Sequence, residues 1–151
     1  MNEQVKKMWL DALRSGDYTQ GREVLHLVTE DGEQRFCCLG VLCDLAHRAG
    51  VVARPESTVA LYGDDTKPYI LKGGTPAIGY TYGWGGSVAD LPHEVVEWAG
   101  LPIYDDDDED AHYFNQGDPY LTDGESRTHV SWFNDNGLTF VEIAVLIEDQ
   151  L

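Results

Sequence analysis

The sequence contains no long apolar run. Its 151 residues nowhere approach the roughly 18 consecutive apolar residues that a membrane-spanning helix requires. The amino end carries Glu3 and Asp11 within an amphipathic pattern, and it lacks the apolar centre of a secretory signal. We therefore expect a protein of the cytoplasm that makes no contact with membranes.

Cysteine is scarce and odd in number. The chain has three cysteines, so they cannot all pair within one molecule. Cys37 and Cys38 are adjacent, and neighbouring cysteines rarely join to each other without strain. Reduced thiols in a reducing compartment fit this pattern best.

Basic residues are also few. Ten lysines and arginines stand against 27 aspartates and glutamates, which gives a net charge of −17. The run Asp105 to Asp110 accounts for only part of this excess. A surface of this charge repels nucleic acid and anionic membranes and attracts basic proteins. We expect no direct binding of nucleic acid.

Apolar periodicity predicts both helices and strands. Helical spacing of apolar residues covers 2–15, about 38–49, and two segments within 127–151 that meet at Gly137. A shorter helix is predicted over 90–100, with Asp90 near its N-cap and Pro92 just inside its start. Strand-forming residues flank Asp31-Gly32, which predicts an antiparallel hairpin, and another strand is expected around Tyr120.

These elements predict an α+β fold. We expect four to five helices packed on a small antiparallel sheet, in a single globular domain over 1–151. Residues 51–90 are rich in glycine and proline, which predicts an irregular segment in which 58–63 and 69–72 could be short strands. An acidic loop is expected at about 104–112.

Three stretches of the sequence indicate a relationship: RFCCLGVLCDLA (35–46), LPHEVVEWAGL (91–101) and FNDNGLTFVEIAVLIEDQL (133–151). Together they resemble a group of small uncharacterised proteins encoded by bacteriophages and by some bacteria, particularly actinobacteria. The resemblance implies a compact accessory protein of phage or prophage origin. Such proteins often act on host factors, including antiviral defence systems, but the resemblance assigns no catalytic residue.

The cysteines admit two interpretations. Cys38 lies at a predicted helix start, where the helix dipole favours a thiolate, and His112 or His129 could act as its base in a cysteine hydrolase. However, His129 is predicted to lie in a helix, whereas cell-wall peptidases with this residue order place the histidine on a strand. The apolar neighbours of Cys38 favour core packing instead.

No metal or cofactor site is predicted. Cys43 and His47 have i, i+4 spacing, but adjacent cysteines do not match the spaced pairs of structural zinc sites. The run 105–116 lacks the glycine at position six and the glutamate at position twelve of a calcium-binding EF-hand loop. A mobile segment or a contact surface for a basic partner is the simpler interpretation.

A glycine-rich stretch, 79–87, presents three aromatic residues. Tyr80, Tyr82 and Trp84 could anchor a protein interface or stack on a base. Phosphate recognition would also require donors, which convergent arginines could supply: Arg22, Arg35, Arg48 and Arg54. No P-loop or dinucleotide-binding motif accompanies them.

The leading hypothesis is a non-enzymatic phage-type protein that inhibits a host factor in the bacterial cytoplasm, with counter-defence as one role. Its contacts would be an acidic surface and an aromatic loop: Asp105, Asp106, Asp107, Asp108, Glu109 and Asp110, with Tyr80, Tyr82 and Trp84. The first alternative is sequestration of a small nucleotide immune signal by the aromatic loop and the four arginines. The second is a cysteine hydrolase that uses Cys38 and a histidine.

Overall fold

The structure is a computed structural model, and it describes residues 1–29, 31–53, 77–79, 89–102, 117–125 and 127–151. Several residues of the functional hypotheses lie outside this part of the chain: Arg54, Tyr80, Tyr82, Trp84, Asp105–Asp110 and His112. The two short strands considered at 58–63 and 69–72 also lie outside it.

Five helices and six short strands are formed by the described residues. The helices are α1 (Glu3–Ser15), α2 (Cys38–Arg48), α3 (His93–Ala99), α4 (Val130–Asp135) and α5 (Phe140–Gln150). The strands are β1 (Thr19–Gln20), β2 (His26–Thr29), β3 (Gln34–Phe36), β4 (Ala77–Gly79), β5 (Tyr120–Thr122) and β6 (Arg127–His129). This arrangement confirms the α+β prediction.

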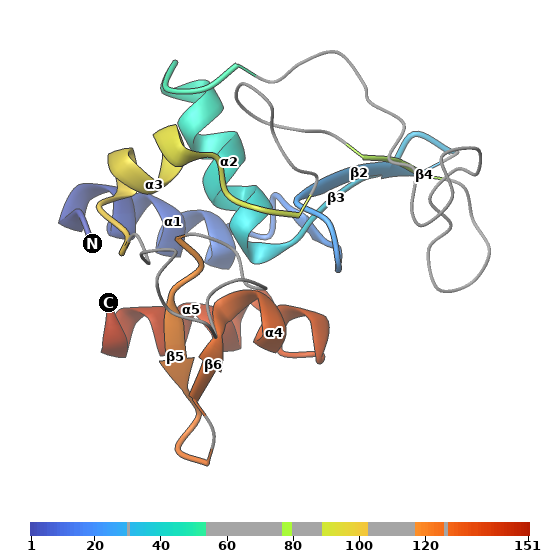
Figure 1. Ribbon diagram of the computed structural model, residues 1–151. Coiled ribbons are helices and arrows are strands. Elements are labelled where there is room, and N and C mark those ends of the chain that lie inside the picture. Colours follow the sequence, from blue (N-terminus) through green and yellow to red (C-terminus); the bar gives the residue numbers. More distant parts are fainter. Residues whose placement is uncertain (30, 54–76, 80–88, 103–116, 126) are drawn as a thin grey trace, which may run out of the picture.

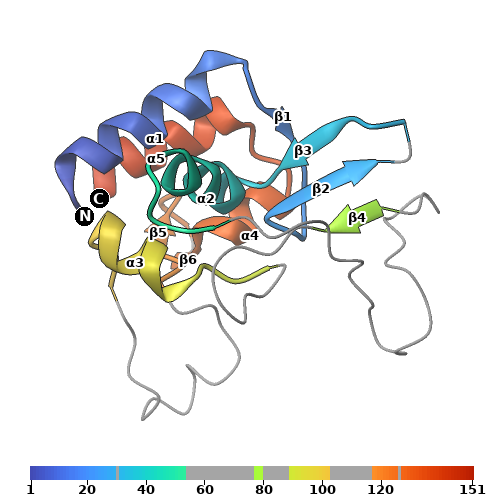
Figure 2. The same cartoon turned by 90° about the horizontal axis from the view of Figure 1, so that it is seen from above.

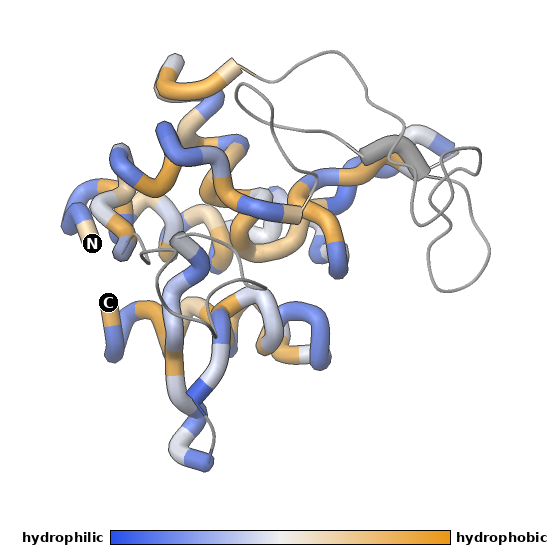
Figure 3. The backbone as a smooth tube through the Cα atoms, viewed as in Figure 1, coloured by the Kyte–Doolittle hydropathy of each residue, from blue (hydrophilic) through white to orange (hydrophobic). Residues whose placement is uncertain are grey.

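The helices pack around α2. Helix α1 lies beside both α2 and α5, and α2 also contacts α3 and α4 (Figures 1 and 2). The first two turns of α2 are apolar and its last turn is hydrophilic (Figure 3), so its amino-terminal part lies deepest in the core. There, the Trp9 indole Nε1 donates to the Cys38 carbonyl at 2.9 Å, which satisfies the polar atom of a fully buried ring.

The larger sheet projects from one side of the helices (Figure 2) and has the strand order β1-β3-β2-β4. Strands β2 and β3 form the predicted antiparallel hairpin, in which Leu27 pairs with Arg35. Strand β4 adds antiparallel to β2, with Gly79 opposite Leu27. Strand β1 adds parallel to β3, with Thr19 opposite Arg35. Leu27 and Arg35 therefore lie side by side on one sheet face.

The second sheet is the antiparallel pair β5 and β6, in which Tyr120 pairs with His129. It confirms the strand expected near Tyr120. It also corrects the prediction that a helix includes 127–129, because these residues form β6 and α4 begins only at Val130. Backbone pairing with the neighbouring strand β5 outweighs the helical apolar spacing here.

Three further differences concern element ends and short strands. Pro92 is the N-cap of α3 and not a residue inside it, and no side chain caps that helix. Strand β4 forms in a segment predicted as a loop, and the two-residue β1 was not predicted. Helix α5 begins with a capping box formed by Thr139 and Glu142.

Candidate functional site

The three thiols belong to the core. Cys38 and Cys43 have no exposed surface, and Cys37 is 5% exposed. Burial raises the pKa of the Cys38 and Cys43 thiols well above the ordinary value, and it raises that of Cys37 to about 12. Cys37 Sγ caps α2 by accepting from the Gly40 N–H at 3.3 Å. Buried, protonated thiols are poor nucleophiles, so these observations favour core packing.

His129, the base of the hydrolase alternative, is held by its own neighbours. Its Nδ1 lies 3.0 Å from the Asp118 carbonyl oxygen, and its ring lies against Tyr120 with centroids 4.0 Å apart. The Cys38 thiol is directed elsewhere, since its Sγ lies 3.7 Å from the Val130 carbonyl oxygen. The strand position of His129 removes one objection to the hydrolase, but the burial of Cys38 leaves that alternative without geometric support.

Asp118 is the second titratable group beside His129. It is 1% exposed, and its Oδ2 lies 4.0 Å from His129 Nδ1. Burial raises the pKa of the Asp118 carboxyl to about 6, because a low-dielectric environment disfavours the charged form. Sequence analysis did not identify this buried pair.

The metal-binding alternatives find no support in the part of the chain that the structure describes. No group of three or more histidine, cysteine, aspartate or glutamate side chains there is placed to hold an ion. His47 Nδ1 lies 3.0 Å from the Val52 carbonyl oxygen, and Cys43 is buried in the core. Among the same described residues, no helix is both long and apolar enough to cross a membrane.

Arg48 has a structural partner on its own helix. Its Nε lies 2.8 Å from Asp44 Oδ2, which also accepts from the Tyr18 hydroxyl at 2.8 Å. Desolvation and this hydrogen bond raise the pKa of Tyr18. Arg48 therefore joins α2 to the segment before β1, apart from the other two described arginines of the nucleotide hypothesis.

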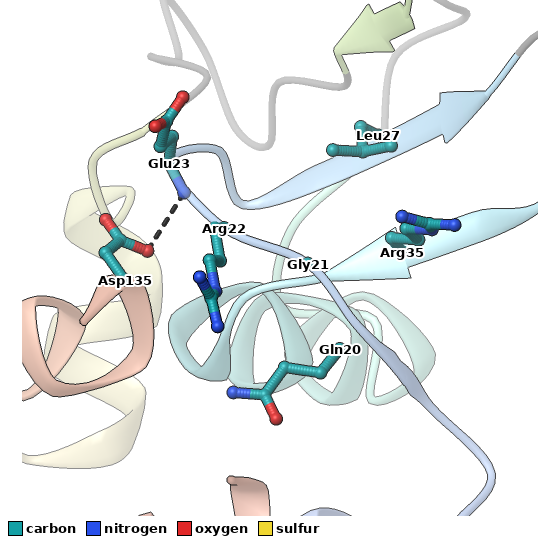
Figure 4. A pocket seen from close by; sticks show the side chains of 7 residues that line it. All are labelled: Gln20, Gly21, Arg22, Glu23, Leu27, Arg35 and Asp135. Atoms are coloured by element: carbon teal, nitrogen blue, oxygen red, sulfur yellow. Dashed lines mark hydrogen bonds between the residues drawn. The ribbon is translucent and has the colours of Figure 1, made fainter. Parts of the chain in front are cut away.

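Arg22 and Arg35 line one pocket of about 260 Å³ (Figure 4). Its walls come from the start of the larger sheet and from the end of α4: Gln20, Gly21, Arg22, Glu23, Leu27, Arg35 and Asp135. The structure thus brings together two of the four arginines. Their guanidinium groups extend in different directions, and Arg22 lies between Asp135 and Arg35 in this view.

The backbone of this pocket is held in a defined conformation. The Gly21 N–H donates to the Phe36 carbonyl at 2.6 Å, and a Cβ at Gly21 would lie 3.0 Å from Arg35 Cβ. Glu23 has a φ of 68°, an uncommon left-handed conformation for a residue other than glycine. The Glu23 N–H donates to Asp135 Oδ1 at 2.9 Å, which holds that turn against α4.

Asn134 supports the pocket from the interior. It is fully buried, and its Oδ1 accepts from Cys38 N–H at 3.2 Å and from Gln20 Nε2 at 3.0 Å. Its Nδ2 donates to the Gly21 carbonyl at 2.9 Å and to Asp135 Oδ1 at 3.0 Å. The Gln20 amide also bonds to the backbone of 138 and 140, so it positions the pocket wall.

Two groups of the pocket remain available for other contacts. Arg35 donates through Nε and Nη2 to Glu33, at 2.9 and 2.6 Å. Within the described residues, the Arg22 side chain makes no hydrogen bond or ion pair, and Asp135 Oδ2 accepts no hydrogen bond. Arg22 and Asp135 therefore line the same pocket without pairing with each other.

Sequence reasoning did not identify most of this site. Gln20 to Glu23 and Asp135 are more than 110 positions apart, and each looks locally like an ordinary turn or helix-end residue. The pair Asn134-Asp135, at the end of an apolar pattern, gives no local sign that one side chain is buried. Only the parallel addition of β1 and its contacts with α4 bring these residues together.

The chain belongs to a protein family described as a domain of unknown function (DUF8296), whose model matches residues 1–151. The match therefore covers the whole chain. Neither a curated protein sequence nor a solved structure matches it.

Proposed function

We propose that this protein is a non-enzymatic accessory protein of bacteriophage type that binds and inhibits a host factor. It would act in the cytoplasm of the bacterial host, with a basic surface on the partner protein as its target. The proposal rests on the net charge of −17 and on a fold in which the thiols are core residues. The phage setting comes from the resemblance of the three sequence stretches.

One observation carries the proposal: among the described residues, four of the seven lysine and arginine side chains form ion pairs with carboxylates of the same fold. Lys7 pairs with Asp11, and Arg14, Arg35 and Arg48 pair with Glu148, Glu33 and Asp44. Many exposed carboxylates have no cationic partner among the described residues, including Glu3, Asp17, Glu94, Glu125 and Asp149. Acidic charge is therefore left available for a partner, whose association it would accelerate by electrostatic steering.

The test begins with affinity capture from host lysate at low and high salt. A captured protein is then purified and its affinity measured against wild type and against a variant with 105–110 changed to asparagine and glutamine. We expect binding that weakens with salt and falls at least tenfold in the neutral variant. Equal affinity of the two proteins at all salt concentrations would contradict the proposal.

A second candidate function is sequestration of a small nucleotide signal. It is favoured by the pocket that Arg22 and Arg35 share. It is also favoured by the pairing of Gly79 with Leu27, a residue of that pocket, because Gly79 directly precedes Tyr80 in the sequence. Nucleotides retained by the purified protein can be released by denaturation and identified by mass spectrometry. If the protein carries none and binds none when they are added, this candidate is excluded.

A further inference from the structure

We propose that the pocket beside Asp135 binds a small zwitterion of the α-amino-acid type. In this site the Arg22 guanidinium holds the ligand carboxylate, and Asp135 Oδ2 accepts from the ligand ammonium group. This inference is independent of the inhibitor function, because it concerns a small molecule and other residues of the chain. It also assigns the pocket a ligand class other than a nucleotide.

The pocket lining carries charges of both signs. Arg22 and Arg35 share it with the carboxylates of Glu23 and Asp135, and Arg35 is already paired with Glu33. A phosphate group would meet the repulsion of these carboxylates and of a protein with net charge −17. A ligand with one positive and one negative group avoids that repulsion and satisfies both kinds of lining residue.

The two proposed anchors, Arg22 and Asp135, form no ion pair with each other. Arg22 Nη2 lies 3.6 Å from where a Cβ of Gly137 would be, so the guanidinium lies along the connection that leaves α4. Asp135 ends α4 and also lines the pocket. A guanidinium presents paired N–H donors that match a carboxylate bidentately, and this geometry suits the carboxylate of an amino acid.

The Asp135 carboxylate is held by one of its two oxygens. Its Oδ1 accepts from Glu23 N–H at 2.9 Å and from Asn134 Nδ2 at 3.0 Å. These two bonds fix the side chain, and Oδ2 accepts no hydrogen bond from the described residues. An ammonium group has three donors and finds in Oδ2 a charged acceptor that needs no rearrangement.

The size of the pocket suits a single amino acid. A pocket of about 260 Å³ lies just below the range of roughly 300–1,000 Å³ that is usual for ligand sites, and it is small for a dinucleotide. Leu27 contributes to the lining (Figure 4) but is only 1% exposed, so the charged groups carry the recognition.

The experiment measures binding of individual L-amino acids to the full-length protein by ligand-observed NMR, with calorimetry on each one that binds. Each binder is compared with its N-acetyl and carboxamide derivatives, which lack the positive and the negative charge respectively. We expect each derivative to bind roughly 10- to 100-fold more weakly, as for loss of a charge-assisted hydrogen bond.

Two variants locate the site. Arg22→Gln removes the cation, and Asp135→Asn removes the anion while keeping an oxygen that can accept from Glu23. We expect each to weaken amino-acid binding roughly 10- to 100-fold. Arg127→Gln is the control, since Arg127 lies over the Tyr120 ring, 5.2 Å from its centroid, in the other sheet. It should bind like the wild type.

Three results would overturn the inference. The first is that no amino acid binds to the wild-type protein. The second is that the two pocket variants bind as tightly as Arg127→Gln. The third is that AMP or pyrophosphate binds in the pocket when amino acids do not, which would favour the nucleotide candidate. None of these results affects the salt-dependent capture of a host protein, so the two proposals fail separately.

Discussion

Asn134 and Asp135 are neighbours in sequence, but they stand in contrasting environments. Asn134 is fully buried, and both polar atoms of its amide bond to other elements. Asp135 is half-buried and has one oxygen bonded and one available. The first residue joins β1, α2 and α4, whereas the second presents charge to a pocket.

The same contrast holds across the segment Gln20–Glu23. Its inner side is bonded to Asn134, Phe36 and the start of α5, and its outer side carries Arg22. A buried polar group that loses its partner costs free energy, so the inner side must be complete for the chain to fold. An exposed arginine without a partner has no such constraint. Stability and binding are therefore expected to depend on different residues a few ångströms apart.

The largest effect is expected in the interior, for Gly40→Ala. A Cβ at Gly40 would lie 1.5 Å from the Leu25 carbonyl oxygen and 2.4 Å from the Leu25 carbonyl carbon. These are backbone atoms, so α2 and the residue before β2 would have to separate. We expect a cost comparable with the roughly 5–15 kcal/mol that stabilises a domain, and therefore no cooperative unfolding transition by circular dichroism.

The matched control is Gly16→Ala. Gly16 has a φ of 79° and no atom within 4 Å of the added Cβ, so only backbone strain is introduced. We expect a loss of about 1 kcal/mol from the free energy of unfolding. If Gly40→Ala lowers the free energy of unfolding by no more than Gly16→Ala does, the close contact between α2 and the Leu25 backbone is contradicted.

Asn134→Ala is expected to have the next largest effect. It leaves the Cys38 N–H and the Gly21 carbonyl without their side-chain partner, and it removes one of the bonds of the Gln20 amide. At roughly 1–3 kcal/mol for each buried group left unsatisfied, the free energy of unfolding should fall by about 3–5 kcal/mol. Urea denaturation measures this change. Asn136→Ala, which removes an exposed helix-end bond, should change it by less than about 0.5 kcal/mol.

A third effect, of intermediate size, should depend on pH through Asp118. The pKa of this buried carboxyl is about 6 in the folded state, above the unfolded value near 4, so the folded state binds more protons between these values. The contribution of Asp118 to the free energy of unfolding is therefore highest below about pH 4, and it is lost as the pH rises through about 6. Asp118→Asn removes the titration, so its stability relative to wild type should rise across that window by roughly 2–3 kcal/mol.

Urea denaturation of both proteins at intervals from about pH 4 to pH 8 tests this prediction. His129 lies beside Asp118, with its Nδ1 4.0 Å from Asp118 Oδ2, so His129→Gln provides the comparison. In that variant the dependence on Asp118 should persist, since burial is its main cause. Parallel stability curves for wild type and Asp118→Asn would contradict the assigned pKa.

The sequence predicted the local parts of this fold well. Helices α1, α2 and α5 follow from apolar spacing and end signals, and the hairpin follows from Asp31-Gly32, because each signal lies within one short stretch. Strands β1 and β6 were not predicted, because pairing with a neighbouring strand decides their conformation. Strand β1 has only two residues and shows no alternation, and the residues of β6 continue the apolar spacing of α4.

The site was less predictable than the fold. Arg22 and Arg35 were identified as candidates, but Arg48 was grouped with them although it pairs with Asp44 on its own helix. Asp135 was not identified, because its role depends on a contact with Glu23 across more than 110 residues. Residue type alone does not distinguish a carboxylate that lines a pocket from one that faces solvent.

The smallest effect on stability is expected at the pocket itself. Arg22 is exposed and makes no described hydrogen bond or ion pair, so Arg22→Gln should change the free energy of unfolding by less than about 0.5 kcal/mol. Urea denaturation checks this value beside that of Asn134→Ala. A loss as large as that of Asn134→Ala would mean that Arg22 supports the fold, and the contrast between the inner and outer sides of Gln20–Glu23 would disappear. A small loss would show that Arg22 is dispensable for folding, as a residue reserved for binding should be.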